Sequence, residues 1–253
     1  AYIKRKKMSS SVIIIPTRLA AKRLPGKPLL KINNIEVIIH CMQRAVEAKI
    51  GEVIIATPDK EIFDLVKKNS GNALLTSNDH ASGTDRIFEA VKKLSDKNIK
   101  ICINLQGDLP NFNPHDIKKL NDLMQKHKYE IGTLASPIQN TDEFKNRNIV
   151  KVETKETLND SNFVSAIDFF RKTSSSASKM IYHHIGIYAY DVQTLNKYVN
   201  LKRTQNEIER SLEQMRAIDN NINIHVALSS SLPLGVDTKE EFVAVKKSME
   251  YKD

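Results

Sequence analysis

The chain has 253 residues, 40% of them hydrophobic and 27% charged, which is the composition of a soluble globular protein large enough for an α/β domain. No apolar run is long enough to cross a membrane and no secretory signal is visible, so we expect a cytoplasmic protein without a membrane partner. The net charge of +9 makes nucleic acid a partner to consider, but the lysines are scattered without interleaved aromatic residues, which argues against it.

The first predicted strand is Ser11 to Ile15, a β-branched run typical of a strand buried on both faces of a parallel sheet. Pro16 ends it, and the loop that follows holds four cations within ten positions, namely Arg18, Lys22, Arg23 and Lys27. Ligands of α/β sheets bind at the carboxyl ends of strands, where guanidinium and ammonium groups can neutralise phosphate oxygens. The loop therefore indicates a polyphosphate site, although a solvated basic loop fits these charges equally well.

Strand and helix patterns alternate through the rest of the first half. We predict strands at 52–57, 73–76 and 100–105, and helices at 37–48, 61–68, 86–94 and 114–126. Asn113 as an N-cap and Pro114 in the first turn mark the start of the last of these helices. This repetition predicts a doubly wound, mostly parallel sheet whose loops meet at one edge.

The second half is less regular, which indicates a smaller lobe of mixed strands. Strand character is present at 133–138, 150–153, 185–190 and 224–228, and helical character at 191–199 and 207–217. The low-complexity stretch 172–178 predicts a mobile loop. Thr238 and Glu241 have capping-box spacing at the start of the last helix.

Two aspartates stand at the ends of predicted elements. Asp108 follows the strand at 100–105, and Asp237 precedes the last helix. Magnesium prefers one or two protein carboxylates together with phosphates and water, so a carboxylate near a phosphate loop is well placed to hold it. Alternatively, Asp108 is a turn residue after Gly107 and Asp237 favours a helix N-terminus. Together with the basic loop, the pair favours a metal role for both aspartates.

At this point the sequence resembles a known family. The chain is similar to 3-deoxy-manno-octulosonate cytidylyltransferases, or CMP-KDO synthetases, from Ser11 to Glu250. Six ordered blocks carry the resemblance: RLPGKPL at 23–29, DHASGTDR at 79–86, QGD at 106–108, HIGIY at 184–188, LEQMR at 212–216 and GVDT at 235–238. The first block alone would indicate only a sugar nucleotidyltransferase.

The resemblance implies transfer of CMP from CTP to KDO (3-deoxy-manno-octulosonate), with release of pyrophosphate, for lipopolysaccharide synthesis. It implies a sugar-nucleotide transferase fold of the Rossmann type with a smaller mixed α/β lobe. The expected catalytic residues are Arg18, Arg23, Lys27, Asp108 and Asp237, the two aspartates being ligands of a magnesium cofactor. Positioning and charge neutralisation are sufficient for in-line attack at the α-phosphorus, so no covalent enzyme intermediate is needed.

The resemblance also implies contacts for the two substrates. The expected nucleotide-binding residues are Ser82, Gly83, Arg86 and Gln106, and the expected sugar-binding residues are Arg171, His184, Tyr188, Glu213 and Gln214. Each group has a structural alternative. Ser82 has the position of a helix N-cap, His184 and Tyr188 fit a packed strand, and Glu213 has the spacing to pair with Arg216.

The chain departs from the family pattern at several positions. Ala21 and Lys22 stand where the family usually has Ser and Thr, Leu109 replaces Glu, and Phe170 replaces Ser before Arg171. The segment from Lys172 to Tyr182 looks shorter than usual. Two alternatives therefore remain open: a cytidylyltransferase for another acid sugar, and a non-catalytic sugar-nucleotide binding protein.

We expect a single nucleotidyltransferase domain at 8–253. Its nucleotide-binding part covers about 10–130 and 223–253, and its smaller lobe, for sugar binding and dimerisation, covers about 131–222. Residues 1–7 are expected to be a leader, because Met8 looks like a natural start. The homodimer is carried over from the family resemblance, since the sequence has no heptads.

Overall fold

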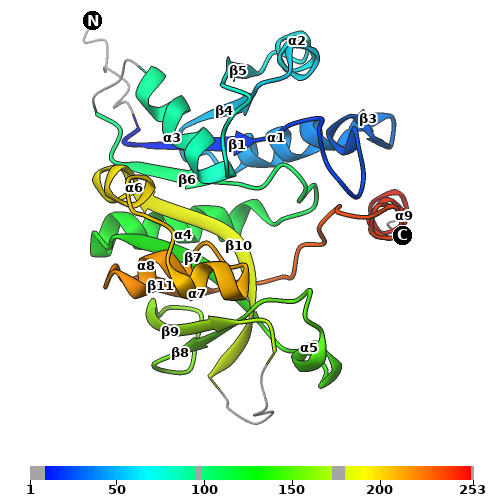
Figure 1. Cartoon of the computed structure of the whole chain (residues 1–253). Helices are drawn as coiled ribbons and strands as arrows, with labels where there is room; N and C mark the ends of the chain where they lie inside the picture. Colours follow the sequence, from blue (N-terminus) through cyan, green and yellow to red (C-terminus); the bar gives the residue numbers. More distant parts are fainter. Residues whose placement is uncertain (1–8, 95–97, 173–179, 252–253) are drawn as a thin grey trace, which may run out of the picture.

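The computed structural model describes residues 9–94, 98–172 and 180–251. The strands of its main sheet are β1 (Ser11–Pro16), β4 (Glu52–Thr57), β5 (Asn72–Leu75), β6 (Ile101–Asn104), β7 (Ile131–Pro137), β8 (Lys151–Thr154), β9 (Val164–Phe170), β10 (Ile181–Asp191) and β11 (Ile224–Leu228). They lie in the order β5-β4-β1-β6-β10-β7-β11-β9-β8, and β10 also pairs with β8 (Figure 1). A small hairpin joins β2 (Lys31–Ile32) to β3 (Ile35–Glu36).

The sheet is parallel on one side and mixed on the other. Strands β5, β4, β1 and β6 are parallel to one another, as predicted. Strand β10 is antiparallel to both β6 and β7, and β9 is antiparallel to both β11 and β8. The prediction of a mostly parallel sheet is therefore wrong for the sheet as a whole, because β10 enters its centre in the opposite direction.

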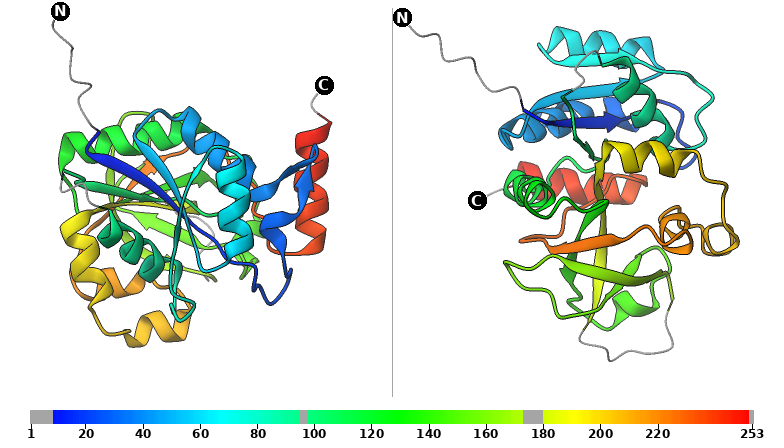
Figure 2. Two further views of the ribbon diagram at one scale, coloured as in Figure 1. Left: turned by 90° about the horizontal axis from the view of Figure 1, so that it is seen from above. Right: turned by 90° about the vertical axis from the view of Figure 1, so that its left-hand side faces the viewer.

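Helices cover both faces of the sheet. One face carries α1 (Val37–Glu47), α2 (Lys60–Lys68) and α4 (Pro114–His127), and the other carries α3 (Gly83–Lys93), α6 (Val192–Val199) and α8 (Met215–Asp219), as Figure 2 shows. The remaining helical segments are η1 (Lys27–Leu29), α5 (Asp142–Lys145), α7 (Gln205–Arg210) and α9 (Lys239–Glu250). In the part of the chain that the structure describes, no helix is long and apolar enough to span a membrane.

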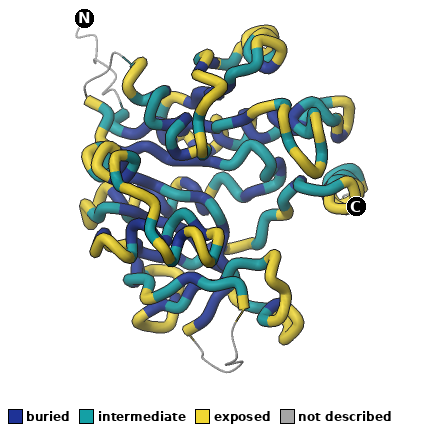
Figure 3. Tube along the Cα trace, viewed as in Figure 1, coloured by how far each residue is buried: buried dark blue, intermediate teal, exposed yellow. Residues whose placement is uncertain are grey.

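Strand β1 lies between two hydrophobic cores, one on each face of the sheet. Ile13 and Ile15 point into the core on the α1 face, and Val12 and Ile14 point into the core on the α3 face. All four side chains are buried because alternate residues of a strand face opposite sides of the sheet. Figure 3 shows the same distribution along the chain, with buried positions concentrated in the central strands and exposed positions in outer helices such as α2 and α9.

The predicted helix starts are confirmed by their caps. Asn113 Oδ1 accepts the backbone N–H of His115 at 2.9 Å, and Pro114 is the first residue of α4. Thr238 Oγ1 accepts the N–H of Glu241 at 3.2 Å at the start of α9. The carboxyl ends of β1, β4, β5 and β6 lie at one edge, so the loops that follow these strands meet there.

The second half differs from the prediction in several places, one of which is the short helix α5, which was not predicted. The helix predicted at 207–217 is two helices, α7 and α8, because Ser211 adopts the left-handed conformation with φ 52° and ends α7. The prediction also missed β9. The mobile loop predicted at 172–178 lies outside the described residues except for Lys172.

Candidate active site

The basic loop after β1 is held in place by backbone hydrogen bonds. The N–H of Thr17 donates to the carbonyl of Ala56 at 3.0 Å, and the N–H of Gly26 donates to the carbonyl of Leu19 at 3.0 Å. Gly26 has φ 71°, a left-handed conformation that glycine adopts without the steric cost of a Cβ. The loop therefore closes on itself before η1 begins at Lys27.

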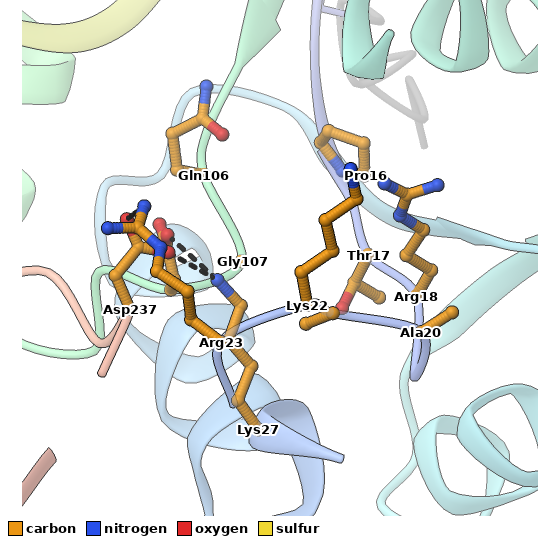
Figure 4. Close-up of a pocket in the computed structure, with 12 residues that line it drawn as sticks. Pro16, Thr17, Arg18, Ala20, Lys22, Arg23, Lys27, Gln106, Gly107 and Asp237 are labelled. Atoms are coloured by element: carbon orange, nitrogen blue, oxygen red, sulfur yellow. Dashed lines mark hydrogen bonds and ion pairs between the residues drawn. The ribbon is translucent and has the colours of Figure 1, made fainter. Parts of the chain in front are cut away.

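A cavity of about 370 Å³ opens between this loop and the end of β6. It is lined by Pro16, Thr17, Arg18, Ala20, Ala21, Lys22, Arg23, Lys27, Gln106, Gly107, Asp108 and Asp237 (Figure 4). The four cations of the basic loop and both predicted metal ligands thus lie around one cavity. The cavity is large enough for phosphate groups and open enough to admit them.

Two distant parts of the chain bring the aspartates together. Asp108 follows Gly107, where a Cβ would lie 3.2 Å from the carbonyl oxygen of Pro16, so glycine lets the chain after β6 lie this close to the end of β1 without displacing a neighbour. The N–H of Val236 donates to the carbonyl of Asp108 at 2.9 Å, which fixes the segment that carries Asp237. As predicted, the two carboxylates therefore share the sheet edge with the cations.

Lys27 lies between the two carboxylates. Its Nζ is 3.3 Å from Asp108 Oδ2 and 3.0 Å from Asp237 Oδ1, and Arg23 Nη2 is 3.1 Å from Asp237 Oδ2. Burial alone would lower the pKa of Lys27, but the charges of Asp108 and Asp237 outweigh it and raise that pKa above its ordinary value. Burial raises the pKa of Asp108, an effect that Lys27 opposes and Asp237 reinforces.

These carboxylates fit a magnesium ion. Two oxygens from different carboxylates already converge on one cationic centre, the Lys27 ammonium, within 3.3 Å. No cluster of three or more potential metal-ligating His, Cys, Asp or Glu residues occurs among the described residues. Two carboxylates are nevertheless enough for magnesium when phosphates and water complete its coordination.

Arg18 and Lys22 differ from the other two cations. Both line the cavity, but within residues 9–94, 98–172 and 180–251 neither has a hydrogen bond or an ion pair. Figure 4 shows their side chains on the opposite side of the cavity from Arg23 and Lys27. The cavity therefore has one half in which charges neutralise each other and another half with two free cations.

A second cavity, of about 140 Å³, adjoins the first and shares Pro16, Thr17, Arg18 and Gln106 with it. Its remaining lining residues, His80, Ala81, Ser82, Gly83 and Arg86, come from the loop before α3 and from the first turn of that helix. The cavity therefore contains all four residues predicted to bind the nucleotide. A ligand could occupy both cavities with Arg18 at their junction.

The residues of this second cavity also have structural roles. Ser82 Oγ accepts the N–H of Asp85 at 3.2 Å, so its predicted role as a helix N-cap is confirmed. Arg86 Nη1 donates to Thr76 Oγ1 at 2.5 Å and to the carbonyl of Ser77 at 2.8 Å. Burial and then the charge of Arg18 lower the pKa of Arg86. Gln106 Nε2 donates to the carbonyl of Gly186 at 3.0 Å, next to a register shift in β10.

The predicted sugar-binding residues of β10 lie in a row of aromatic contacts. His184 and Tyr188 have ring centroids 5.5 Å apart, Tyr188 stacks on Tyr190 at 5.8 Å, and Tyr190 lies 6.1 Å from Tyr198. Burial lowers the pKa of His184 to about 3, so its imidazole is neutral at physiological pH. Thr133 Oγ1 and His184 Nε2 are hydrogen-bonded at 3.0 Å.

Glu213 connects this row of aromatic residues to the start of α3, where the predicted nucleotide-binding residues Ser82, Gly83 and Arg86 lie. Thr84 Oγ1 donates to Glu213 Oε1 at 2.6 Å, and the Tyr198 hydroxyl lies 2.8 Å from the backbone carbonyl of Glu213. Arg216 pairs with Glu207 at 2.6 Å, so the alternative that Glu213 pairs with Arg216 is not supported. Gln214, the next residue, stands at the N-terminus of α8.

Arg171 has its guanidinium engaged with the backbone. Its Nε, Nη1 and Nη2 donate to the carbonyls of Arg210, Arg147 and Ser211 at 3.1, 3.2 and 2.9 Å. These contacts hold the turn that leads from α7 to Glu213. A role for Arg171 in binding the sugar carboxylate stays a prediction.

Comparisons with known proteins agree with one another. A family model described as Cytidylyltransferase matches residues 12–224. A 3-deoxy-manno-octulosonate cytidylyltransferase from Afipia carboxidovorans is 41% identical over 238 residues, which are 94% of this chain and 96% of the relative. The chain belongs to the 3-deoxy-manno-octulosonate cytidylyltransferase family. It is therefore a nucleotidyltransferase.

Other comparisons support the same family. A cytidylyltransferase of this name from Rhizobium etli is 37% identical over 237 residues, 93% of this chain and 94% of the relative. A solved CMP:2-keto-3-deoxy-manno-octonic acid synthetase complexed with CTP has a TM-score of 0.86 and 35% identity, covering 95% of this chain and 98% of that one. A glucose-1-phosphate thymidylyltransferase from Bacillus anthracis, described as putative and 13% identical with a TM-score of 0.66, shows the shared fold alone.

Three departures of this cytidylyltransferase from the family pattern, at Ala21, Lys22 and Leu109, lie at or next to the cavity, whereas Phe170 is in β9 and does not line it. Lys22 lines it directly, and Leu109 follows Asp108 and packs against the α1-side core. Sequence reasoning missed Thr84 and Tyr198, which contact Glu213, because neither residue stands out by type or spacing. Thr84 lies inside the block at 79–86, which is the one signal that could have found it.

Proposed function

We propose that the protein transfers CMP from CTP to the anomeric hydroxyl of KDO, releasing pyrophosphate and giving CMP-KDO for lipopolysaccharide synthesis. The observation that carries this proposal is the convergence of Asp108, Asp237 and Lys27 within 3.3 Å, beside the cations of the basic loop and the predicted nucleotide loop. Membership of the 3-deoxy-manno-octulosonate cytidylyltransferase family supports the choice of both substrates. The cytoplasmic location expected from the sequence stays a prediction.

The chain supplies charge where the reaction needs it. Attack of the sugar hydroxyl on the α-phosphorus transfers negative charge to the departing pyrophosphate. Arg18, Arg23 and Lys27 line the cavity and neutralise that charge, the two guanidinium groups by paired hydrogen bonds to phosphate oxygens. The fold brings these cations to one cavity, so they do not have to be recruited from elsewhere in the protein during the reaction.

Asp108 and Asp237 would hold magnesium, whose charge would offset that of the phosphates. The Lys27 ammonium lies between these carboxylates. With magnesium held there, the Lys27 side chain would be available to the phosphates. The proposal therefore gives Lys27 two roles, as a partner of the two carboxylates and as a phosphate ligand.

The two substrates would meet near Gln106. On the nucleotide side, Ser82, Gly83 and Arg86 provide donors and acceptors for the edge of the cytosine ring. On the sugar side, neutral His184, Tyr188, Glu213 and Gln214 offer the mixed donors and acceptors that a sugar with many hydroxyl groups requires. Gln106 connects the sides, because it lines both cavities and donates to β10 at Gly186.

The homodimer is part of this proposal. Strand β9, in the segment assigned to the smaller lobe, leaves Ile167 47% exposed to solvent. A single exposed apolar side chain is common on protein surfaces, so the proposed dimer is carried over from the family resemblance. Sedimentation equilibrium would test the dimer, and a monomer at assay concentrations would contradict it.

The activity is tested by measuring pyrophosphate release from CTP with KDO, with and without magnesium. We expect turnover only when all three are present. A panel of acid sugars tests specificity, and turnover with a nine-carbon acid sugar but not with KDO would overturn the proposed substrate. CTP binding without pyrophosphate release would instead favour a non-catalytic binding protein.

The variant Asp108→Ala should lose turnover while keeping its fold, because a carboxylate at a loop contributes little to core packing. The matched control is Asp122→Ala, on the exposed face of α4, where Asp122 pairs with Lys118 at 2.7 Å. Full activity of Asp108→Ala in the presence of magnesium would rule out the metal role of this residue.

A further inference from the structure

Asp59 stands between β4 and α2, at a position where an aspartate usually caps the helix that follows. Its backbone carbonyl accepts the N–H of Phe63 at 3.1 Å, but its side chain makes no capping hydrogen bond to α2. Instead, Asp59 Oδ2 accepts the backbone N–H of Leu19 at 2.8 Å. The carboxylate therefore holds the basic loop, which is distant in sequence, and not its own helix.

Together with a backbone hydrogen bond of Thr17, this contact fixes the backbone on both sides of Arg18. The N–H of Thr17, before Arg18, donates to the carbonyl of Ala56 at 3.0 Å. The N–H of Leu19, after Arg18, donates to Asp59, and the carbonyl of Leu19 accepts the N–H of Gly26 at 3.0 Å. The end of β4 and the start of α2 thus determine how the loop leaves the sheet.

The side chain of Arg18 has no support of its own. It is exposed, and within the described residues it makes no hydrogen bond or ion pair. It nevertheless lines the first cavity (Figure 4) and also the second, at their junction. A long side chain without partners is directed only by the backbone that carries it. The hydrogen bond of Leu19 to Asp59 therefore limits where the Arg18 guanidinium can reach.

The charge of Asp59 acts in the same region. Burial and the neighbouring Arg18 lower the pKa of Arg86, and the negative charges of Glu89 and Asp59 oppose that effect. Asp59 therefore offsets part of the repulsion between two cations that line the second cavity. A hydrogen bond from a backbone N–H to a carboxylate is also stronger than one to a neutral acceptor.

We propose that Asp59 is a positioning residue for Arg18, acting through the N–H of Leu19 to hold Arg18 at the junction of the two cavities. The proposal rests on the proposed function only in that Arg18 is taken to bind the phosphates of CTP. Asp59 itself touches neither substrate and is not a catalytic residue.

The first test compares Asp59→Ala with Asp59→Asn in the full chain. Removing the acceptor should lower kcat/KM for CTP roughly tenfold, mainly through KM, because a misplaced binding group costs affinity and orientation. Asparagine keeps an acceptor oxygen for Leu19 and should restore kcat/KM to within about threefold of the unmodified protein. The control is Asp64→Ala on α2, where Asp64 pairs only with Lys60 among the described residues, and it should leave kcat/KM unchanged.

A double-mutant cycle with Arg18→Ala separates positioning from general destabilisation. If Asp59 acts through Arg18, then Asp59→Ala should change kcat/KM less than about twofold in the Arg18→Ala background. An equal loss in both backgrounds would overturn the proposal. So would a failure of Asp59→Asn to restore activity while the protein remains folded.

Hydrogen exchange of the Leu19 amide provides a readout that does not depend on activity. The amide should be protected in the unmodified protein and in Asp59→Asn, and should exchange faster in Asp59→Ala. Equal protection in all three would contradict the role of Asp59. If the unmodified protein released no pyrophosphate, the proposed function would fail, whereas amide exchange and calorimetric binding of CTP would still test Asp59.

Discussion

The four cations of the basic loop are not equivalent. Arg23 and Lys27 are paired with Asp237 and Asp108, whereas Arg18 and Lys22 have no partner within the described part of the chain. A free cation does not have to leave a carboxylate before it binds phosphate. We therefore expect Arg18 and Lys22 to contribute more to the initial binding of CTP than the paired cations of the loop do.

Replacing Lys22 tests this expectation. Lys22→Thr, which restores the residue type usual in the family, should raise KM for CTP about five- to tenfold, on the order of 1 kcal/mol. The effect should shrink at high salt, because ions screen an exposed charge. Steady-state kinetics at two ionic strengths measure both results. Lys118→Thr, which removes an exposed lysine of α4, is the control, and an equal rise in KM for that variant would contradict the role of Lys22.

At the level of elements, His225 of β11 packs against side chains of neighbouring segments. The ring stacks on Tyr129 with centroids 3.5 Å apart, and Nε2 lies 3.2 Å from Ser165 Oγ of β9. Nδ1 is buried and has no hydrogen-bond partner among the described residues. Burial, followed by the charges of His127 and Lys155, lowers the pKa of His225 to about 4.

This pKa predicts a pH dependence of stability. The unfolded chain binds a proton at His225 near pH 6.5 and the folded protein only near pH 4, so the free energy of unfolding falls as the pH drops through this window. Between about pH 7.5 and about pH 5 the loss from this one residue is about 2 kcal/mol. His225→Phe should remove that part of the loss, as measured by urea unfolding at the two pH values. An unchanged difference between the two pH values would contradict the prediction.

Local sequence patterns predicted some elements well and others poorly, for physical reasons. The parallel strands and α4 were predicted from buried β-branched runs and from Asn113 with Pro114, which are local signals. The break between α7 and α8 depends on Ser211, whose left-handed conformation is stabilised by tertiary contacts such as the bond from Arg171 to its carbonyl. Serine gives no signal for that conformation, so the break could not be predicted.

Buried Lys151 shows the same limit. Its side chain has no exposed surface, and its Nζ donates to the carbonyls of Asn146, Ile149 and Arg171 at 2.6 to 2.8 Å. A lysine in a strand pattern usually points to solvent. Two of the three carbonyls belong to the loop just before β8 and the third to Arg171, after β9. They make the burial acceptable, but backbone carbonyls occur at every residue and so give no signal in the sequence.

For the whole molecule, the site depends on contacts between parts of the chain that are far apart. The sequence alone indicated the phosphate loop and Asp108, because both follow buried strands. That Asp237 lies between Arg23 and Lys27 depends on how the segment after β11 crosses to Asp108, which includes the bond from Val236 to the carbonyl of Asp108. No local pattern encodes such a crossing. The pairing of the two aspartates was predicted from their places at the ends of elements, and the family resemblance supported it.

The same arrangement predicts how the folded protein responds to removal of metal. Because Lys27 and Arg23 together balance the charges of the two carboxylates, removing divalent ions should leave them without strong repulsion. The thermal midpoint should therefore be the same, to within about 2 °C, with and without a chelator. Differential scanning calorimetry measures it, and a drop of about 5 °C or more would show that a bound metal holds the fold together.

A lysine between two acidic groups would make the proposed loading with magnesium an exchange of partners. What would change on binding is which positive charge faces each carboxylate. We therefore expect protein purified without divalent ions to keep its reaction centre assembled.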